Sequence, residues 1–222
     1  ALAAAMFYGV ADYSGSRGSR LASSAAITFV GQAAALVIIS LYLLVFRSSP
    51  PPLESWLWTT GGGFGGAIAL VAFYQAMSKG SMTVIAPITA VIGLSVPVIA
   101  GFIEGERPET LAWFGIALAV VAVALVGDVL DKHDLPTSMS AIWLAVAAGF
   151  GFGMIFVCLA NASHDHGIWP LFGQRLVSVP TVAAIALMQT RKVTVPKAAI
   201  GFALAAGILD TSANGLYLFA TS

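Results

Sequence analysis

Three ionisable residues, Asp12, Arg175 and Asp210, lie inside long apolar stretches, where a charge needs a partner or water. Asp210 follows Lys197 by 13 residues, which in a helix is about 20 Å. Arg175 precedes Arg191 by 16 residues, or about 24 Å of helix. The two helices are consecutive and would run antiparallel, so we expect both charges at a similar depth. They either pair with each other, as a structural ion pair, or face a wet cavity as a site for a substrate or a proton.

Polar side chains accompany these charges at helical spacing. Asn214 and Tyr217 follow Asp210 by four and seven residues, which places them on one helix face and is typical of a face that lines an interior. Asp12 lies five residues before Arg17 and either reaches the membrane interface or belongs to the site. Side chains that could orient a ligand, or instead join two helices, are Tyr8, Tyr74, Gln75, Gln32 and Gln174. Together with Arg175, these residues form the candidate substrate-binding set.

A metal or catalytic site is less well supported by the sequence. His164 and His166 flank Asp165, but zinc takes three or four ligands, and the only other histidine, His133, lies in another loop. The single cysteine, Cys158, lies in an apolar run. We therefore expect no metal, no cofactor and no enzymatic activity. A membrane-embedded enzyme acting on a lipid or lipid-linked substrate is the alternative.

The segments that would position these residues are too apolar for a soluble protein. The 222 residues are 59% hydrophobic and 9% charged, against about 25% charged residues in soluble domains. The net charge is zero, and no basic tract indicates a nucleic acid partner. A bilayer core needs roughly 20 residues of helix. The sequence predicts an all-α integral membrane protein, a polytopic helical bundle with eight apolar runs at about residues 1–16, 23–46, 56–78, 81–103, 110–127, 138–163, 167–190 and 198–222.

An internal repeat relates the two ends of the chain. At an offset of about 142, Gly31 and Gln32 face Gly173 and Gln174. At an offset of about 143, residues 72–78 face residues 215–221. The identities are few, but they agree with helix order, because the sixth to eighth runs would then repeat the first to third.

Residues 72–78, the helix that contains Pro97, and the turn from Glu104 to Arg107 resemble the EamA repeat of the drug/metabolite transporter superfamily. The resemblance implies two five-helix repeats, here residues 1–130 and the incomplete 138–222. Eight of ten helices would be present, in a truncated chain. Because five is odd, the second repeat would enter the membrane inverted, with the substrate near the midplane between the repeats.

The resemblance also implies a secondary transporter that exports a small metabolite, amino acid or drug-like molecule across the cytoplasmic membrane by alternating access. A small molecule and the lipid bilayer would be its partners, and the sequence predicts neither the substrate nor the oligomeric state. Without a nucleotide-binding loop, the energy would come from an ion or solute gradient.

The orientation in the membrane is left open by two conflicting signals. Seven of the lysine and arginine residues fall in the odd-numbered loops and two in the even-numbered loops, which by the positive-inside rule places the N-terminus outside. The family resemblance implies a cytoplasmic N-terminus instead. The seven residues are Arg17, Arg20, Lys79, Lys132, Arg191, Lys192 and Lys197, and the two are Arg47 and Arg107.

Overall fold

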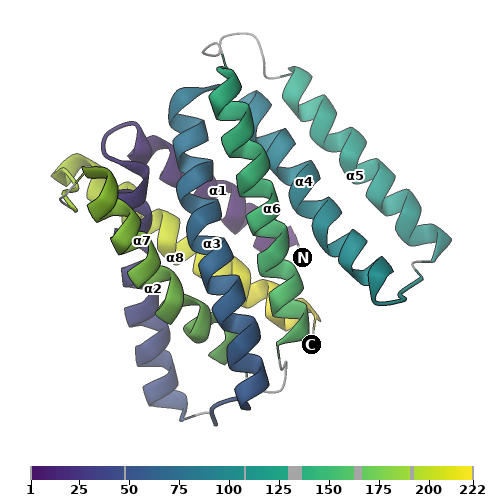
Figure 1. Cartoon of the computed structure of the whole chain (residues 1–222), viewed down its shortest axis with the longest axis horizontal. Helices are drawn as coiled ribbons and strands as arrows, with labels where there is room; N and C mark the ends of the chain where they lie inside the picture. The colour runs from purple at the N-terminus through teal and green to yellow at the C-terminus, as the bar shows by residue number, and fades with distance from the viewer. Residues whose placement is uncertain are drawn as a thin grey trace.

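The computed structural model describes residues 2–47, 49–107, 109–129, 137–162, 167–190 and 193–221. Within these ranges, every regular element is an α-helix (Figure 1). The predicted all-α fold is therefore confirmed, with helix ends close to those of the predicted runs. The helices are α1 (Leu2–Ser19), α2 (Ser24–Phe46), α3 (Leu53–Lys79), α4 (Met82–Ile103), α5 (Thr110–Val129), α6 (Met139–Asn161), α7 (Trp169–Thr190) and α8 (Lys197–Thr221).

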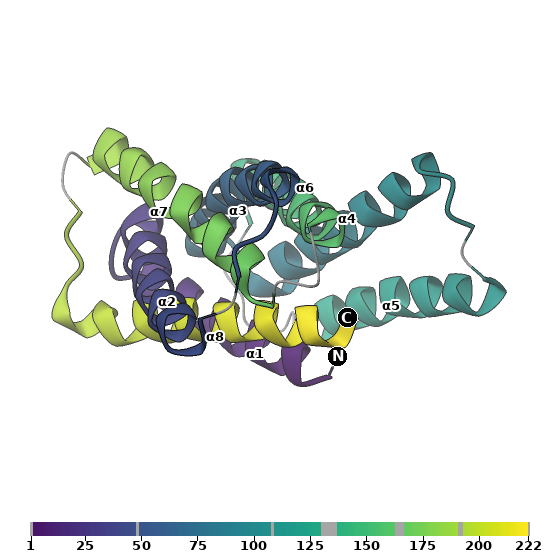
Figure 2. The same cartoon turned by 90° about the horizontal axis from the view of Figure 1, so that it is seen from below.

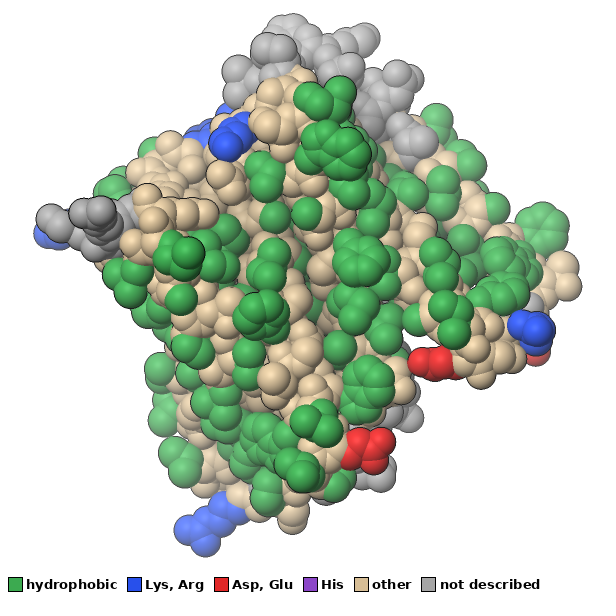
Figure 3. Space-filling model, in the orientation of Figure 1, with side chains coloured by type: hydrophobic (Ala, Val, Ile, Leu, Met, Phe, Trp, Pro, Cys, Tyr) green, Lys and Arg blue, Asp and Glu red, His purple; other side chains and the backbone are tan. Residues whose placement is uncertain are grey.

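Six of these helices, α2, α3, α4, α6, α7 and α8, are long and apolar enough to cross a membrane. Eight spans were expected from the sequence, and α1 and α5 fall outside this group; in α5 the apolar stretch is the shorter Ala112–Val123. Figure 3 shows hydrophobic side chains spread over one face of the molecule, with the charged side chains at its margins. Such a surface is suited to contact with lipid tails rather than with water.

Local signals in the sequence set where the helices begin and turn. Ser23 and Ser138 precede α2 and α6, and each side-chain hydroxyl accepts a hydrogen bond from a backbone N–H in the first turn. This satisfies a donor that has no partner within the helix. Gly105 adopts a φ of 93° between α4 and α5, a backbone conformation that side chains disfavour. The α4–α5 connection can therefore turn sharply.

The helices form two layers (Figure 2). In one layer α3 packs against α6, and in the other α1 packs against α8. Helix α2 contacts both α7 and α8. Helix α4 packs against α6, and α5 packs against α4. The space between the two layers holds the candidate site.

The helix contacts recur with a shift of five helices. If α1, α2 and α3 correspond to α6, α7 and α8, each contact between the two groups should have a counterpart. The α3–α6 contact has its counterpart in the α8–α1 contact, and the α3–α7 contact in the α8–α2 contact. The α2–α7 contact is its own counterpart. The division into two repeats stays a prediction, and this recurrence is the pattern that a two-fold related pair of helix triplets would produce.

Glycines allow the closest helix approaches. A methyl group on Gly151 of α6 would lie 2.7 Å from the Ala69 Cβ and 3.0 Å from the Gly65 carbonyl oxygen of α3. Where α2 crosses α8, the backbones of Gly31 and Gly207 meet directly. Small residues let helices approach closely in lipid, where no hydrophobic effect drives them together. Gly31, Gly151 and Gly207 therefore serve helix packing.

Candidate functional site

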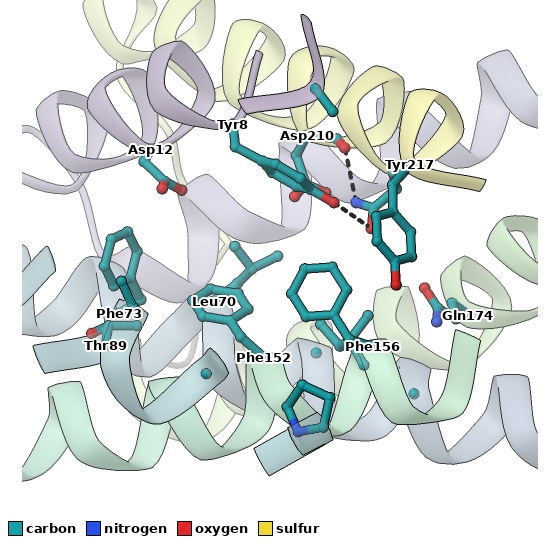
Figure 4. A pocket seen from close by; sticks show the side chains of 18 of the residues that line it. Tyr8, Asp12, Leu70, Phe73, Thr89, Phe152, Phe156, Gln174, Asp210 and Tyr217 are labelled. Atoms are coloured by element: carbon teal, nitrogen blue, oxygen red, sulfur yellow. Dashed lines mark hydrogen bonds between the residues drawn. The ribbon is translucent and has the colours of Figure 1, made fainter. Parts of the chain in front are cut away.

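A cavity of about 800 Å³ lies between the two layers, lined by residues of α1, α3, α4, α6, α7 and α8 (Figure 4). Most of its wall is apolar. The polar lining side chains come mainly from α1, α7 and α8, and they are Tyr8, Asp12, Thr89, Gln174, Arg175, Ser178, Asp210, Asn214 and Tyr217. Seven of the ten candidate residues from the sequence therefore lie around one cavity.

Arg175 and Asp210 form an ion pair across the wall of this cavity. The Arg175 Nη2 atom donates to Asp210 Oδ2 at 2.5 Å and lies 3.1 Å from Thr211 Oγ1. The two charged side chains are only 8% and 16% exposed. The similar depth of the two charges left pairing and exposure to a cavity open, and in the structure the residues pair with each other and also line the cavity. Because α7 and α8 have few other contacts, this pair is a principal link between the two helices.

A chain of hydrogen bonds extends the ion pair to α1. The Tyr8 hydroxyl donates to Asn214 Oδ1 at 3.0 Å, and Asn214 Nδ2 donates to the Asp210 backbone carbonyl at 2.8 Å (Figure 4). Asn214 and Tyr217 share the helix face of Asp210, as their spacing predicted. Side chains of α1, α7 and α8 are thereby joined into one polar network at the cavity wall.

Asp12 lies in the same wall, one helical turn after Tyr8 (Figure 4). Its carboxylate makes no hydrogen bond or ion pair within the described part of the chain. Arg17, which could have drawn it to the membrane interface, is exposed and forms no ion pair with it. Of the two interpretations that the sequence left open, the structure places Asp12 in the cavity.

Aromatic rings make up much of the opposite wall. Phe156 of α6 lies edge-on to Tyr8, with 6.5 Å between ring centroids, and 5.1 Å from the ring of Tyr217. Phe152, one turn earlier on α6, lies 5.6 Å from the ring of Phe73 on α3. Gln174 lines the cavity near Tyr217 (Figure 4). The cavity thus combines polar groups on one side with aromatic surface on the other.

Tyr74, Gln75 and Gln32 do not line this cavity. Tyr74 is buried with its ring against Gly15 of α1, and Gln75 is half-buried on the neighbouring face of α3. Gln32 is buried between α2 and α7, where its Oε1 accepts a hydrogen bond from Ser178. Tyr74 and Gln32 therefore contact other helices, and none of the three residues lines the main cavity.

Several lining residues were not among the candidates from the sequence. Phe152 and Phe156 lie four residues apart on α6. Ser178 follows Arg175 by three residues, on the same face of α7. That spacing was the available signal for Ser178. The phenylalanines gave none, since Phe is equally common on surfaces that face lipid.

The histidines considered as metal ligands, His133, His164 and His166, lie outside the described residues. Among the residues that the structure does describe, no group of three or more His, Cys, Asp or Glu side chains could hold a metal ion.

Comparison with known protein families agrees with this architecture. A model of the EamA-like transporter family matches residues 1–127, more than half of the chain. The protein belongs to the EamA-like transporter family. It is therefore a multi-pass membrane transporter of the drug/metabolite transporter superfamily. The matched region covers α1 to α4 and most of α5. A search of curated proteins finds no match.

Proposed function

We propose that this EamA-like protein is a secondary transporter that moves a small organic molecule by alternating access, with the cavity between the two layers as its substrate site. The observation that carries this proposal is the convergence of Tyr8, Arg175, Asp210 and Asn214 on one cavity inside a membrane transporter. Ionisable residues within a membrane are costly, and they mark substrate or ion pathways. A volume of about 800 Å³ lies in the range of cavities that hold small molecules.

The packing of the layers supports the alternating-access part of the proposal. The cavity lies between the α3–α6 layer and the α1–α8 layer, so a change in their relative tilt would alter its access. The division into repeats at residues 1–130 and 138–222 fits the recurring contacts described above. In such folds the repeats rock against each other around a fixed site.

The ion pair is a link beside the site through which a bound substrate could affect the conformation. Arg175 of α7 and Asp210 of α8 hold two sparsely packed helices together beside the site. A substrate that binds one conformation of this link better than another shifts the balance between conformations by that difference in affinity. We place the protein in the cytoplasmic membrane and the direction of transport outward, following the family resemblance. A gradient would supply the energy.

The proposal is tested by transport in liposomes. Full-chain protein is reconstituted into vesicles loaded with a mixture of amino acids, nucleobases and organic amines, and efflux is followed by mass spectrometry. We expect saturable efflux of a subset of these compounds that responds to an imposed ion gradient, and no efflux from vesicles without protein. Non-saturable leakage would indicate a channel, and a chemically altered product would indicate an enzyme. Either result contradicts the proposal.

A further inference from the structure

The charges in the cavity do not balance. Its charged lining residues are Asp12, Arg175 and Asp210, and the last two neutralise each other as an ion pair. Asp12 is left as a carboxylate with no hydrogen bond or ion pair in the described part of the chain. A lone carboxylate inside a membrane is unfavourable unless it takes up a proton or a cation lies beside it. Asp12 is therefore a site in the cavity that can receive one positive charge.

The position of Asp12 makes its carboxylate available to a ligand. Figure 4 shows the side chain pointing into the space between α1 and the layer that carries Phe73. The carboxylate of Asp210, the other acidic group at the cavity, is paired with Arg175. The charge of the Arg175 guanidinium is thus compensated by a carboxylate of the protein itself.

The rest of the wall is suited to the body of an organic cation. Tyr8 precedes Asp12 by one turn, and the ring contacts run from Tyr8 through Phe156 to Tyr217. Phe73 and Phe152 form a second pair of contacting rings in the wall of the same cavity. Aromatic faces attract ammonium groups through their negative electrostatic potential, and the attraction is stronger where water is excluded.

We propose that the cavity binds an organic monocation, such as an alkyl- or arylamine, with the ammonium group beside Asp12 and the apolar body against the aromatic rings. This inference rests on the proposed carrier function and names the substrate class of the same cavity. It assigns Asp12 as the anchoring residue, whereas the Arg175–Asp210 pair serves to complete the wall.

Three probes of nearly the same shape but different charge test this inference. Phenethylammonium is a cation, 2-phenylethanol is neutral and phenylacetate is an anion. Binding of each to the purified full-chain protein is measured by isothermal titration calorimetry. We expect phenethylammonium to bind at least tenfold more tightly than 2-phenylethanol, and phenylacetate to bind most weakly. In Asp12→Asn the affinity for the cation should fall to that of the neutral probe, while the affinity for 2-phenylethanol stays within twofold.

Two control variants define the role of the charge. Asp12→Glu keeps the carboxylate and should retain the preference for the cation. Glu54→Gln removes an exposed carboxylate at the start of α3 and should leave all three affinities unchanged. If Asp12→Asn does not fold, labelling of wild-type Asp12 by a carbodiimide replaces the comparison. Phenethylammonium should protect this residue from labelling, and 2-phenylethanol should not.

Several results would overturn the inference. These are a preference for the anion, a preference for the cation that survives Asp12→Asn, failure of the cation to protect Asp12, or no binding of any probe. Such results leave the carrier function standing if the vesicles still show saturable, gradient-coupled efflux. Loss of that efflux, by contrast, contradicts the carrier function itself.

Discussion

The α3–α6 and α1–α8 interfaces occupy equivalent places in the fold, yet they differ in chemistry. Between Gly61 and Phe73 of α3, and between Ala148 and Cys158 of α6, the sequence contains no charged residue. The α1–α8 interface carries Asp12 and Asp210. The α3–α6 interface gives the cavity an apolar wall, whereas the α1–α8 interface presents polar groups to it.

The contrast is visible residue by residue. At the offset of about 143, Tyr8 corresponds to Gly151, and Asp210 to Ala67. Gly151 allows close backbone approach, whereas Tyr8 donates a hydrogen bond across the interface. The same helix pairing can therefore serve packing in one layer and chemistry in the other. Similarity of backbone arrangement does not imply similarity of function, because function depends on the side chains placed at equivalent positions.

The largest effect should follow from removing the charge of Asp210. Asp210→Asn leaves the Arg175 guanidinium buried without a counter-charge, which typically costs about 3–5 kcal/mol. We expect a sharp fall in the yield of folded protein and in its melting temperature, measured by size-exclusion chromatography and a thermal-shift assay. The double variant Asp210→Asn with Arg175→Gln should recover more folded protein than either single variant.

Transport by the double variant separates two roles of the pair. If the pair only stabilises packing, both folding and flux return. If it takes part in binding or in the conformational change, folding returns without flux. Wild-type yield and flux in Asp210→Asn alone would remove this residue from both roles.

A smaller effect is expected from adding a methyl group to the packing interface. In Gly151→Ala the new carbon would meet Ala69 and Gly65 at 2.7 and 3.0 Å, and overpacking of this kind typically costs about 1–3 kcal/mol. Among the described residues, a methyl group added at Gly215 of α8 would meet no atom within 4 Å beyond the neighbouring backbone of its own helix. Gly215→Ala should therefore leave the stability unchanged or raise it by up to about 1 kcal/mol through helix propensity. The melting temperature should fall in Gly151→Ala and should stay unchanged or rise in Gly215→Ala. Equal shifts would contradict the assignment of close packing to the α3–α6 interface.

The smallest effect concerns the hydrogen bond between α1 and α8. Tyr8→Phe removes the donor to Asn214 but retains the ring and its contact with Phe156. Interhelical hydrogen bonds in membranes contribute about 0.6 kcal/mol on average. We expect a small decrease in thermal stability, with Tyr13→Phe, at an exposed tyrosine on the same helix, as the control. A loss as large as that of Asp210→Asn would show that Tyr8 does more than join two helices.

The sequence predicted how deep a residue lies in the membrane better than it predicted which face of the helix lines the cavity. The meeting of Arg175 and Asp210 followed from distances along two consecutive helices. Tyr74 and Tyr217 correspond at the offset of about 143, but only Tyr217 lines the cavity. In a soluble helix the polar face indicates the rotation, whereas in a membrane helix the faces toward lipid and toward protein are both apolar. The sequence pattern therefore could not assign Tyr74 or Phe156 to a face.

Helix α2 meets α8 at Gly31 and Gly207, where backbone touches backbone. Along the same contact, side chains of the two helices share hydrophobic clusters, Ile27 with Ala203 and Leu43 with Leu218. Helix α2 also packs along α7, and α7 and α8 barely touch each other. Helix α2 therefore bridges α7 and α8, and the ion pair from Arg175 to Asp210 is a further direct link between these two helices.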